Sequence, residues 1–230
     1  ADLPPDLARE LDITVVPLNV QFGEETFLDG VNLDADQFFQ RLVTEPNLPT
    51  TSQPSPGDFL ETYDQLGKDA EGIVSIHVSS KLSGTYNSAI QGKAQSSATC
   101  PIEVVDSTQA CMALGVVAIA AAKEASKGSA VEAVADVARG AAPRSKLYFL
   151  LNTLEYLQKG GRIGKARAML GAMLNIKPIL IVRDGEVHEL GKARTFAKGV
   201  ARVKEVTREF APLESLYVLH TTTPDLAGEI

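Results

Sequence analysis

The architecture of this chain follows from two short stretches rich in β-branched residues, Gly72-Ile73-Val74-Ser75-Ile76-His77-Val78 and Ile102-Glu103-Val104-Val105. The first precedes a helix-forming stretch near 84–97, and the second precedes a long Ala-rich stretch that reaches about Lys127. Strand-length runs that alternate with helix-length runs are typical of βαβα units. Such units favour a mostly parallel sheet flanked by helices.

The pattern continues beyond this block. Ser129 and Glu132 have the spacing of a capping box, which predicts a further helix that ends near Arg139. The stretch 146–151 is strand-like, and Thr153 is expected to cap the helix that follows it.

A different sequence pattern flanks the βαβα block. Residues 13–22 and 179–190 are predicted to form half-buried strands, and the second stretch is expected to fold back at Asp184-Gly185, because both residues tolerate positive φ. A helix over about 195–210 and a strand over 216–220 are predicted to complete an antiparallel part. We therefore expect an α/β protein of two domains, the second of the α+β type.

The expected domains are discontinuous in sequence. A parallel α/β domain is predicted over residues 1–12 and 47–152, and a second α+β domain over residues 13–46 and 153–230.

Composition excludes several classes of protein. The chain has 230 residues, of which 44% are hydrophobic and 22% charged, as in ordinary globular proteins. Its longest apolar stretch, 110–122, is too short to cross a bilayer as a helix, and no secretory signal is visible. Cys100 and Cys111 form neither a redox pair nor a disulfide framework. A cytoplasmic protein with no membrane span is the expectation.

Charge is distributed unevenly along the chain. Residues 1–115 carry 5 basic and 17 acidic side chains, whereas residues 116–230 carry 17 basic and 12 acidic ones. The basic excess between Lys159 and Arg208 fits a solvated face, a nucleic-acid surface or a docking patch for an acidic protein. A net charge of −7 and the lack of a recognition-helix motif argue against nucleic acid.

One polar segment precedes a predicted helix. Ser55 is expected to be the N-cap of this helix, with Pro56 in its first position. Because Pro54 keeps the chain before it extended, the polar side chains there can meet a ligand. These side chains are Thr51, Ser52 and Gln53. The alternative is that they only form hydrogen bonds within a turn.

A second polar segment, residues 79–86, follows the first predicted strand and opens a helix. Free backbone N–H groups at the helix start, together with the hydroxyl of Ser83, can donate to a carboxylate or phosphate. Gly84 would let the ligand approach the chain closely. Capping of the helix by Ser83 is the alternative.

Hydroxyl-bearing residues also follow other predicted strands. In open α/β sheets, ligands bind beyond the carboxyl ends of the strands, so these strand ends are expected to converge on one crevice. The segments are Asp106-Ser107-Thr108, Asn152-Thr153 and Thr221-Thr222-Thr223.

Catalytic signatures are otherwise weak. Counting back from Gly164-Lys165 places Lys159 where a phosphate-binding P-loop needs its first glycine, and the dinucleotide motif is absent. The three histidines, His77, His188 and His220, are isolated in the sequence, so we expect structural roles for them. No metal site and no catalytic nucleophile are nominated.

The motifs together resemble the DegV family of bacterial lipid-binding proteins, and the resemblance spans nearly the whole chain. The matching segments are Ala1-Asp2-Leu3-Pro4-Pro5, Val16-Pro17-Leu18, Thr51-Ser52-Gln53-Pro54-Ser55, Leu82-Ser83-Gly84-Thr85-Tyr86, Tyr156-Leu157-Gln158-Lys159-Gly160-Gly161-Arg162-Ile163 and Leu174-Asn175-Ile176-Lys177-Pro178-Ile179-Leu180. Family members have a hydroxyl-rich strand before the position of Ala1 and a His-bearing loop beyond Ile230, so the C-terminus is expected to be truncated and the headgroup network incomplete.

The resemblance implies a carrier of one long-chain fatty acid, with the carboxylate between two domains and the tail buried. Thr51 and Ser83 would hold the carboxylate, Arg162 would lie near the headgroup, and Arg194 would serve partner docking. The implied ligand-binding set is Thr51, Ser52, Ser83, Gly84, Thr85 and Arg162.

The resemblance also implies a partner. In members similar to fatty-acid-kinase binding subunits, a separate ATP-dependent kinase phosphorylates the bound acid to an acyl phosphate for phospholipid metabolism. The chain itself would be non-catalytic, without a cofactor, and a monomer or weak oligomer. The alternative is an α/β enzyme that acts on a phosphorylated or keto small molecule in the same crevice.

Two stretches with small and flexible residues are candidates for the tail pocket, 112–119 and 168–174. Ordinary packing of helices against the sheet is the alternative.

Overall fold

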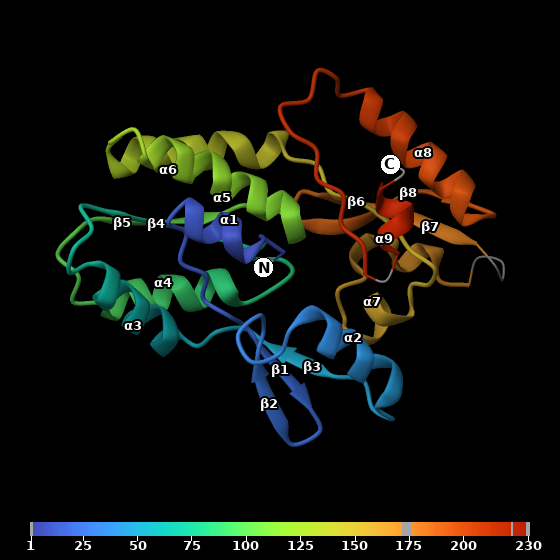
Figure 1. The fold of residues 1–230 in the computed structure, drawn as a ribbon, viewed down its shortest axis with the longest axis horizontal. Helices are drawn as coiled ribbons and strands as arrows, with labels where there is room; N and C mark the ends of the chain where they lie inside the picture. The colour runs from blue at the N-terminus through green and yellow to red at the C-terminus, as the bar shows by residue number, and fades with distance from the viewer. Residues whose placement is uncertain (1, 172–175, 222, 229–230) are drawn as a thin grey trace. The chain divides into compact units, whose positions relative to one another are not determined.

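A computed structural model describes residues 2–171, 176–221 and 223–228 of the chain (Figure 1). Contacts divide the chain into two compact units, Ala1–Ser145 and Lys146–Ile230, which are described separately below. Residues 13–46, expected from the sequence in the second domain, group with the first unit. One reason is that strand β1 (Asn19–Phe22) pairs with β3 (Thr50–Ser52), which leads directly into the helices of that unit.

The centre of the first unit is a parallel pair of strands, β4 (Ile73–His77) and β5 (Ile102–Asp106). Helices pack on both faces of this pair (Figure 1). The helices on one face are α3 (Pro56–Leu66) and α4 (Thr85–Gln95), and those on the other are α5 (Cys111–Ala125) and α6 (Val131–Ala141), which η1 (Ala142–Arg144) follows. The predicted α/β class with a parallel sheet is therefore confirmed.

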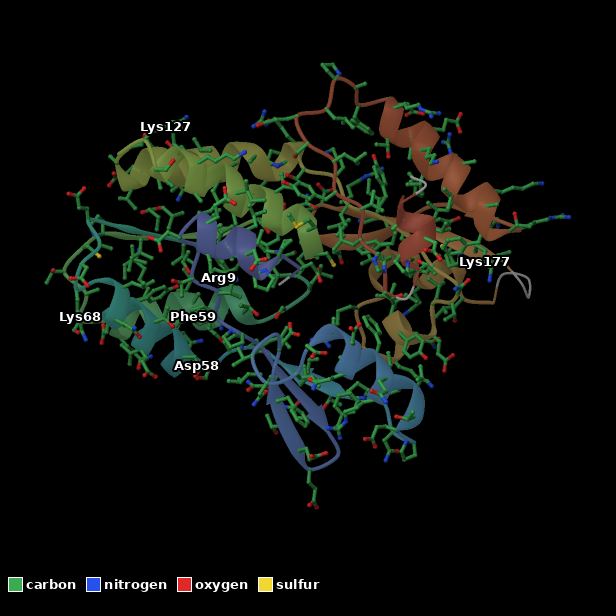
Figure 2. All side chains as sticks on the ribbon, in the orientation of Figure 1. Arg9, Asp58, Phe59, Lys68, Lys127 and Lys177 are labelled. Atoms are coloured by element: carbon green, nitrogen blue, oxygen red, sulfur yellow. The ribbon has the colours of Figure 1, made fainter. Side chains whose placement is uncertain are left out.

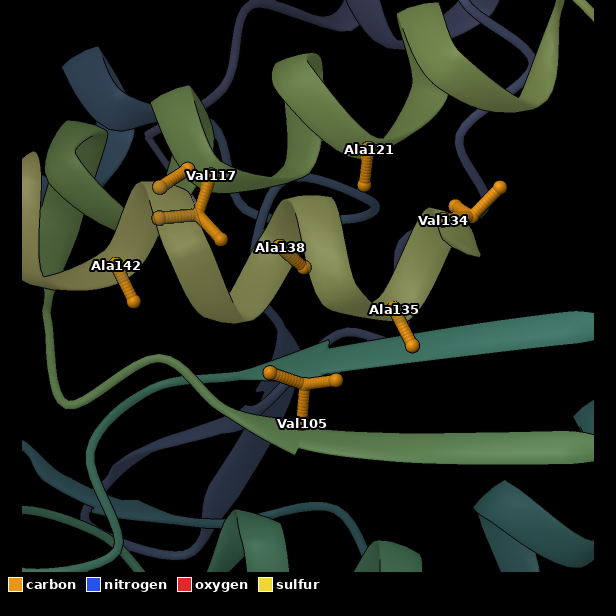
Figure 3. Packing of buried hydrophobic residues seen from close by; sticks show 8 residues of the cluster. Val105, Val117, Ala121, Val134, Ala135, Ala138 and Ala142 are labelled. Carbon is orange, nitrogen blue, oxygen red and sulfur yellow. The ribbon is translucent and has the colours of Figure 1, made fainter. Parts of the chain in front are cut away.

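Alanine-rich packing joins α5 and α6 to the sheet (Figure 3). Val117, Ala135 and Ala138 have no exposed surface, and Val105 of β5 packs against the same cluster. Alanine costs no side-chain entropy in a helix and lets neighbouring elements approach closely. The Ala-rich stretch is thus explained by packing against the sheet.

A small antiparallel sheet completes the first unit, with the strand order β2-β1-β3. Its core contains Val20, Phe22 and Leu33. The remaining elements of this part are α1 (Pro5–Glu10), β2 (Glu25–Leu28) and α2 (Ala35–Thr44). The predicted strand over 13–22 was too long, since β1 begins only at Asn19. Pro17 lacks the N–H that a strand ladder requires there.

The second unit contains an antiparallel sheet with the order β6-β7-β8. Asp184 (φ 51°) and Gly185 (φ 79°) form the turn between β7 and β8, as predicted. The strands are β6 (Tyr148–Leu150), β7 (Lys177–Arg183) and β8 (Glu186–Ala193); the helical elements are α7 (Glu155–Lys159), η2 (Gly164–Met169), α8 (Phe196–Arg208) and α9 (Pro224–Gly228).

Three further local predictions were wrong. Thr153 is not the N-cap of α7, because Leu154 occupies that position. Residues 216–220 form no strand, and Leu216, for example, is 59% exposed. A strand needs a neighbour with which to pair, and residue preference alone does not supply one. Ser129 does not cap α6 either, because Ala130 is the N-cap and the Ser129 hydroxyl donates to Glu124 Oε1 at 2.6 Å.

Candidate functional site

The start of α3 fixes the first polar segment. Ser55 Oγ accepts a hydrogen bond from Asp58 N at 3.2 Å, and Ser55 N donates to the Asp58 carboxylate at 2.7 Å. Pro56 occupies the first turn, and Pro54 is fully buried. Asp58 and the neighbouring Phe59 are labelled in Figure 2. The predicted cap is confirmed, so Ser55 has a structural role.

The pleat of β3 places Thr51 and Ser52, both in the implied ligand-binding set, on opposite faces of the strand. Thr51 lies opposite Val20 of β1, whereas Ser52 lies opposite Asn19. Because successive side chains of a strand point to opposite faces, Thr51 and Ser52 cannot serve one ligand from the same face. Ser52 Oγ also accepts a hydrogen bond from Gln21 Nε2 at 3.2 Å.

The second polar segment forms a tight turn between β4 and α4. Backbone N–H groups of Leu82 and Ser83 both donate to the carbonyl of Ser79, at 2.9 and 3.1 Å. Ser83 Oγ lies 2.8 Å from Thr85 Oγ1 and accepts a hydrogen bond from Thr85 N at 3.3 Å. Gly84 is the N-cap of α4 and no side chain caps this helix. Ser83 therefore shapes the turn without being the N-cap.

Gln53 joins the two polar segments. A Cβ added to Gly84 would lie 2.8 Å from Gln53 Nε2 and 3.1 Å from Gln53 Cδ, so the Gln53 amide rests against this glycine. Thr51 stands two residues before Gln53, which puts the two on the same side of an extended chain and about 7 Å apart. The structure thus brings the Thr51 segment to the turn that contains Ser83 and Thr85. Gly84 makes room for Gln53, which the sequence did not reveal.

The helices behind these segments are also in close contact. A Cβ at Gly92 of α4 would lie 2.6 Å from Phe59 Cβ and 2.8 Å from the Pro56 carbonyl oxygen of α3. Such an approach is open only to glycine. It holds the start of α3, and hence the segment before it, against α4.

The ends of β4 and β5 are joined by hydrogen bonds. Ser79 N donates to the Gln109 carbonyl at 2.8 Å, and Ser107 Oγ donates to the His77 carbonyl at 2.6 Å. The Asp106 carboxylate accepts from Thr108 N at 2.8 Å. Ser79 and Ser107 are completely buried, and the backbone N–H of Ser79 and the hydroxyl of Ser107 link the two strand ends.

The other strand-end segments lie in the second unit. Asn152 and Thr153 border a cavity of about 280 Å³, and Thr153 Oγ1 accepts a hydrogen bond from Glu155 N at 3.1 Å at the start of α7. Thr222 lies outside the described residues.

A buried polar chain behind the turn was not predicted. Tyr63 Oη donates to Ser75 Oγ, and Ser75 Oγ lies 2.8 Å from His77 Nε2. The His77 ring meets the edges of Phe59 and of Tyr86, the residue after Thr85. Burial lowers the pKa of His77 to about 4, so its imidazole is neutral at pH 7. The expected structural role of His77 agrees with this arrangement.

Arg162 and Arg194 belong to the second unit. Arg162 N donates to the Leu157 carbonyl at 3.0 Å, and its Nη1 donates to the Gly160 carbonyl at 2.6 Å, so it is held at the end of α7. Arg194 is exposed just after β8 and precedes Thr195, the N-cap of α8.

The two candidate tail segments differ in what surrounds them. In the stretch 112–119, Met112 and Ile119 pack against Leu3 and Ala8, so helix packing accounts for these residues. In the stretch 168–174, residues 169–171 border the cavity of about 280 Å³, a volume near the lower end of small-molecule sites. Residues 172–174 lie outside the described residues.

Neither membrane-spanning helices nor metal-binding clusters occur in the described residues. Among them, no helix has the length and apolar character to cross a membrane. The same part of the chain contains no group of three or more His, Cys, Asp or Glu side chains placed to hold a metal ion.

Comparison with known proteins agrees with the geometry. The family model described as "Uncharacterised protein, DegV family" matches residues 1–230. A DegV domain-containing protein of Halalkalibacterium halodurans is 40% identical over 100% of this chain and 82% of its own length. Protein DegV of Bacillus subtilis is 33% identical over 100% of this chain and 83% of its own length.

Solved structures of similar proteins carry ligand information in their names. The Bacillus subtilis structure, "DegV, a fatty acid binding protein", has a TM-score of 0.87 and 32% identity, and covers 100% of this chain and 82% of that one. A fatty-acid-binding DegV family protein from Thermus thermophilus has a TM-score of 0.84 and 35% identity, and covers 92% and 75%. The chain therefore belongs to the DegV family.

Proposed function

We propose that this protein binds a long-chain fatty acid and holds its carboxylate with the hydroxyls of Thr51 and Ser83. The single observation that carries the proposal is the contact between Gln53 and Gly84, which brings the Thr51 segment to the Ser83 turn. The similar solved proteins described as fatty acid binding supply the ligand class. Gly84 and Thr85 contribute as parts of the same turn.

Headgroup and tail have different roles in this proposal. Burying about 15 methylenes at roughly 0.8 kcal/mol each gives about 12 kcal/mol gross, whereas each hydrogen bond to a charged headgroup gives roughly 1.5–3 kcal/mol. Association and ordering costs reduce both contributions. The tail therefore dominates the affinity, and the hydroxyls select and orient the acid.

Neutral donors suit a carrier that presents its ligand for reaction. Hydroxyl groups hold the carboxylate without a permanent ion pair, which leaves an oxygen available for phosphoryl transfer by a separate ATP-dependent fatty acid kinase. On this proposal the chain is the non-catalytic binding subunit. Arg162 is proposed to act near the headgroup and Arg194 to dock the kinase; both roles rest on the family resemblance.

The environment of Ser75 argues against hydrolytic chemistry at its contact with His77. The Ser75 hydroxyl also accepts a hydrogen bond from the Tyr63 hydroxyl. Burial lowers the pKa of His77 to about 4, so the His77 imidazole is a weak base. A general base for reaction near pH 7 needs a pKa close to that value.

The proposal is tested by native mass spectrometry and lipid extraction of the purified protein. We expect a bound mass equal to that of a long-chain fatty acid, and loss of most of it in the Thr51→Ala/Ser83→Ala double variant. Protein that carries no fatty acid but is stabilised by phosphorylated or keto metabolites would instead favour the enzyme alternative.

A further inference from the structure

We propose that Gln53 is a headgroup-binding residue that makes the site selective for a carboxylate over a neutral lipid headgroup. The inference rests on the proposed function and extends it to a side chain with a different chemistry. The Gln53 amide lies against Gly84, its backbone is anchored on both sides, and it makes no hydrogen bond to the described residues.

The backbone on both sides of Gln53 is fixed. Before it, the ladder between β1 and β3 ends at the pair Asn19 and Ser52. After it, Pro54 is fully buried and Ser55 caps α3. A side chain held between two such anchors loses little further freedom when a ligand binds, which favours its use in recognition.

The amide itself is placed at the turn. A Cβ at Gly84 would come within 2.8 Å of Gln53 Nε2, so the amide occupies the space that a side chain at Gly84 would fill. Gly84 lies between Ser83 and Thr85, whose hydroxyls are 2.8 Å apart. The Gln53 amide therefore lies against the backbone of the turn that carries this hydroxyl pair.

The hydrogen-bonding capacity of this amide is not used within the described residues. Its neighbours Ser52 and Ser55 have hydrogen-bond partners, whereas the Gln53 side chain is exposed and its amide pairs with none of the side chains or backbone groups described. A primary amide carries two N–H donors and one carbonyl acceptor. The two donors match the oxygens of a carboxylate and add no charge to the site.

Introducing a negative charge at position 53 tests the proposed headgroup contact of Gln53 most clearly. Gln53→Glu keeps the size of the side chain but replaces the two donors by an anion, which repels a carboxylate and has no such effect on a neutral hydroxyl. Gln21→Glu is the matched control, because Gln21 lies on the β1 and β3 face opposite Thr51 and undergoes the same chemical change.

The experiment measures the affinity of each variant for a long-chain fatty acid and for the primary alcohol of the same chain length at pH 7.5. Gln53→Glu is expected to weaken acid binding about tenfold or more, with alcohol binding changed less than about twofold. Gln53→Leu is expected to weaken acid binding in the same direction, while Gln21→Glu leaves the ratio of the two affinities unchanged.

Two results would overturn the assignment. Equal losses for acid and alcohol in both Gln53 variants would mean that Gln53 only packs against Gly84. Unchanged acid binding in Gln53→Glu, with an unchanged melting temperature, would mean that the amide does not meet the headgroup. A wild-type protein that binds no fatty acid would instead refute the proposed function itself.

Discussion

Ser83 Oγ and Thr85 Oγ1 lie 2.8 Å apart at the start of α4, and Ser83 Oγ also accepts a hydrogen bond from Thr85 N. Either hydroxyl can donate within this pair; when Thr85 donates to Ser83, the proton of Ser83 is free for the proposed ligand. A donor that itself accepts hydrogen bonds is strengthened by polarisation. On the proposed function, the pair acts as one donor unit in which Ser83 contacts the carboxylate.

This pairing predicts unequal effects at the two positions. Ser83→Ala should weaken fatty-acid binding by about tenfold or more, because it removes the direct donor to a charged group. Thr85→Val keeps the shape of the side chain and removes only the supporting hydroxyl, so its effect should be smaller. Displacement titrations with a fluorescent fatty acid measure both; a larger loss in Thr85→Val would reverse the assigned roles.

The two faces of β3 give a second prediction. Thr51→Ala should reduce fatty-acid affinity several-fold, since alternation along the extended chain places Thr51 on the same side as Gln53. Ser52→Ala should reduce affinity less, because Ser52 is bonded to Gln21 on the other face. Isothermal titration of the two variants decides between them. Equal losses would show that the strand presents both hydroxyls to the ligand.

Gly84 offers a double-mutant test. Gly84→Ala places a methyl group about 2.8 Å from Gln53 Nε2 and should displace the amide, with reduced binding of the acid. The backbone of Gly84 has φ −73°, which alanine adopts without strain, so folding should be preserved.

Gln53→Ala and the double variant Gln53→Ala/Gly84→Ala complete the double-mutant cycle. Gln53→Ala removes the obstructing amide, so adding Gly84→Ala to it should cause little further loss. The non-additivity of the affinities measures the coupling between the two residues. Fully additive losses would contradict the contact.

His77 predicts a pH dependence of stability. Its pKa is lowered by burial from 6.5 to about 4 in the folded protein, so the unfolded chain binds a proton between these values while the folded one does not. The contribution of His77 to the free energy of unfolding is therefore fully present above pH 6.5. It is lost as the pH is lowered toward 4, and the loss is at most about 3 kcal/mol.

Denaturant midpoints between pH 4 and 7 measure this effect. His77→Gln should flatten the slope, whereas His220→Gln, a change at an exposed residue, should leave it unchanged. An identical slope in wild type and His77→Gln would show that other groups cause the acid destabilisation.

Local signals in the sequence predicted much of the fold. The cap formed by Ser55, Pro56 and Asp58 and the turn at Asp184-Gly185 depend on neighbouring residues only, and both were confirmed. The βαβα order likewise follows from runs of residues that each form one element.

The parts that were missed depend on distant partners. Which face of β3 carries Thr51 is set by its register with β1, and the contact of Gln53 with Gly84 joins residues 31 positions apart. The strand expected over 216–220 failed for the same reason, because pairing requires a neighbour that local preference does not name. Ser129 was misassigned because Glu124 competes for its hydroxyl.

The most direct test of the central claim is the lipid content of purified wild type, of Thr51→Ala/Ser83→Ala and of the control Thr44→Ala/Ser126→Ala, measured by native mass spectrometry. The control removes two hydroxyls that, within the described residues, donate to backbone carbonyls of their own helices. We predict one bound fatty acid in wild type and control, and little in the site variant. Equal fatty-acid occupancy in all three proteins would contradict the account.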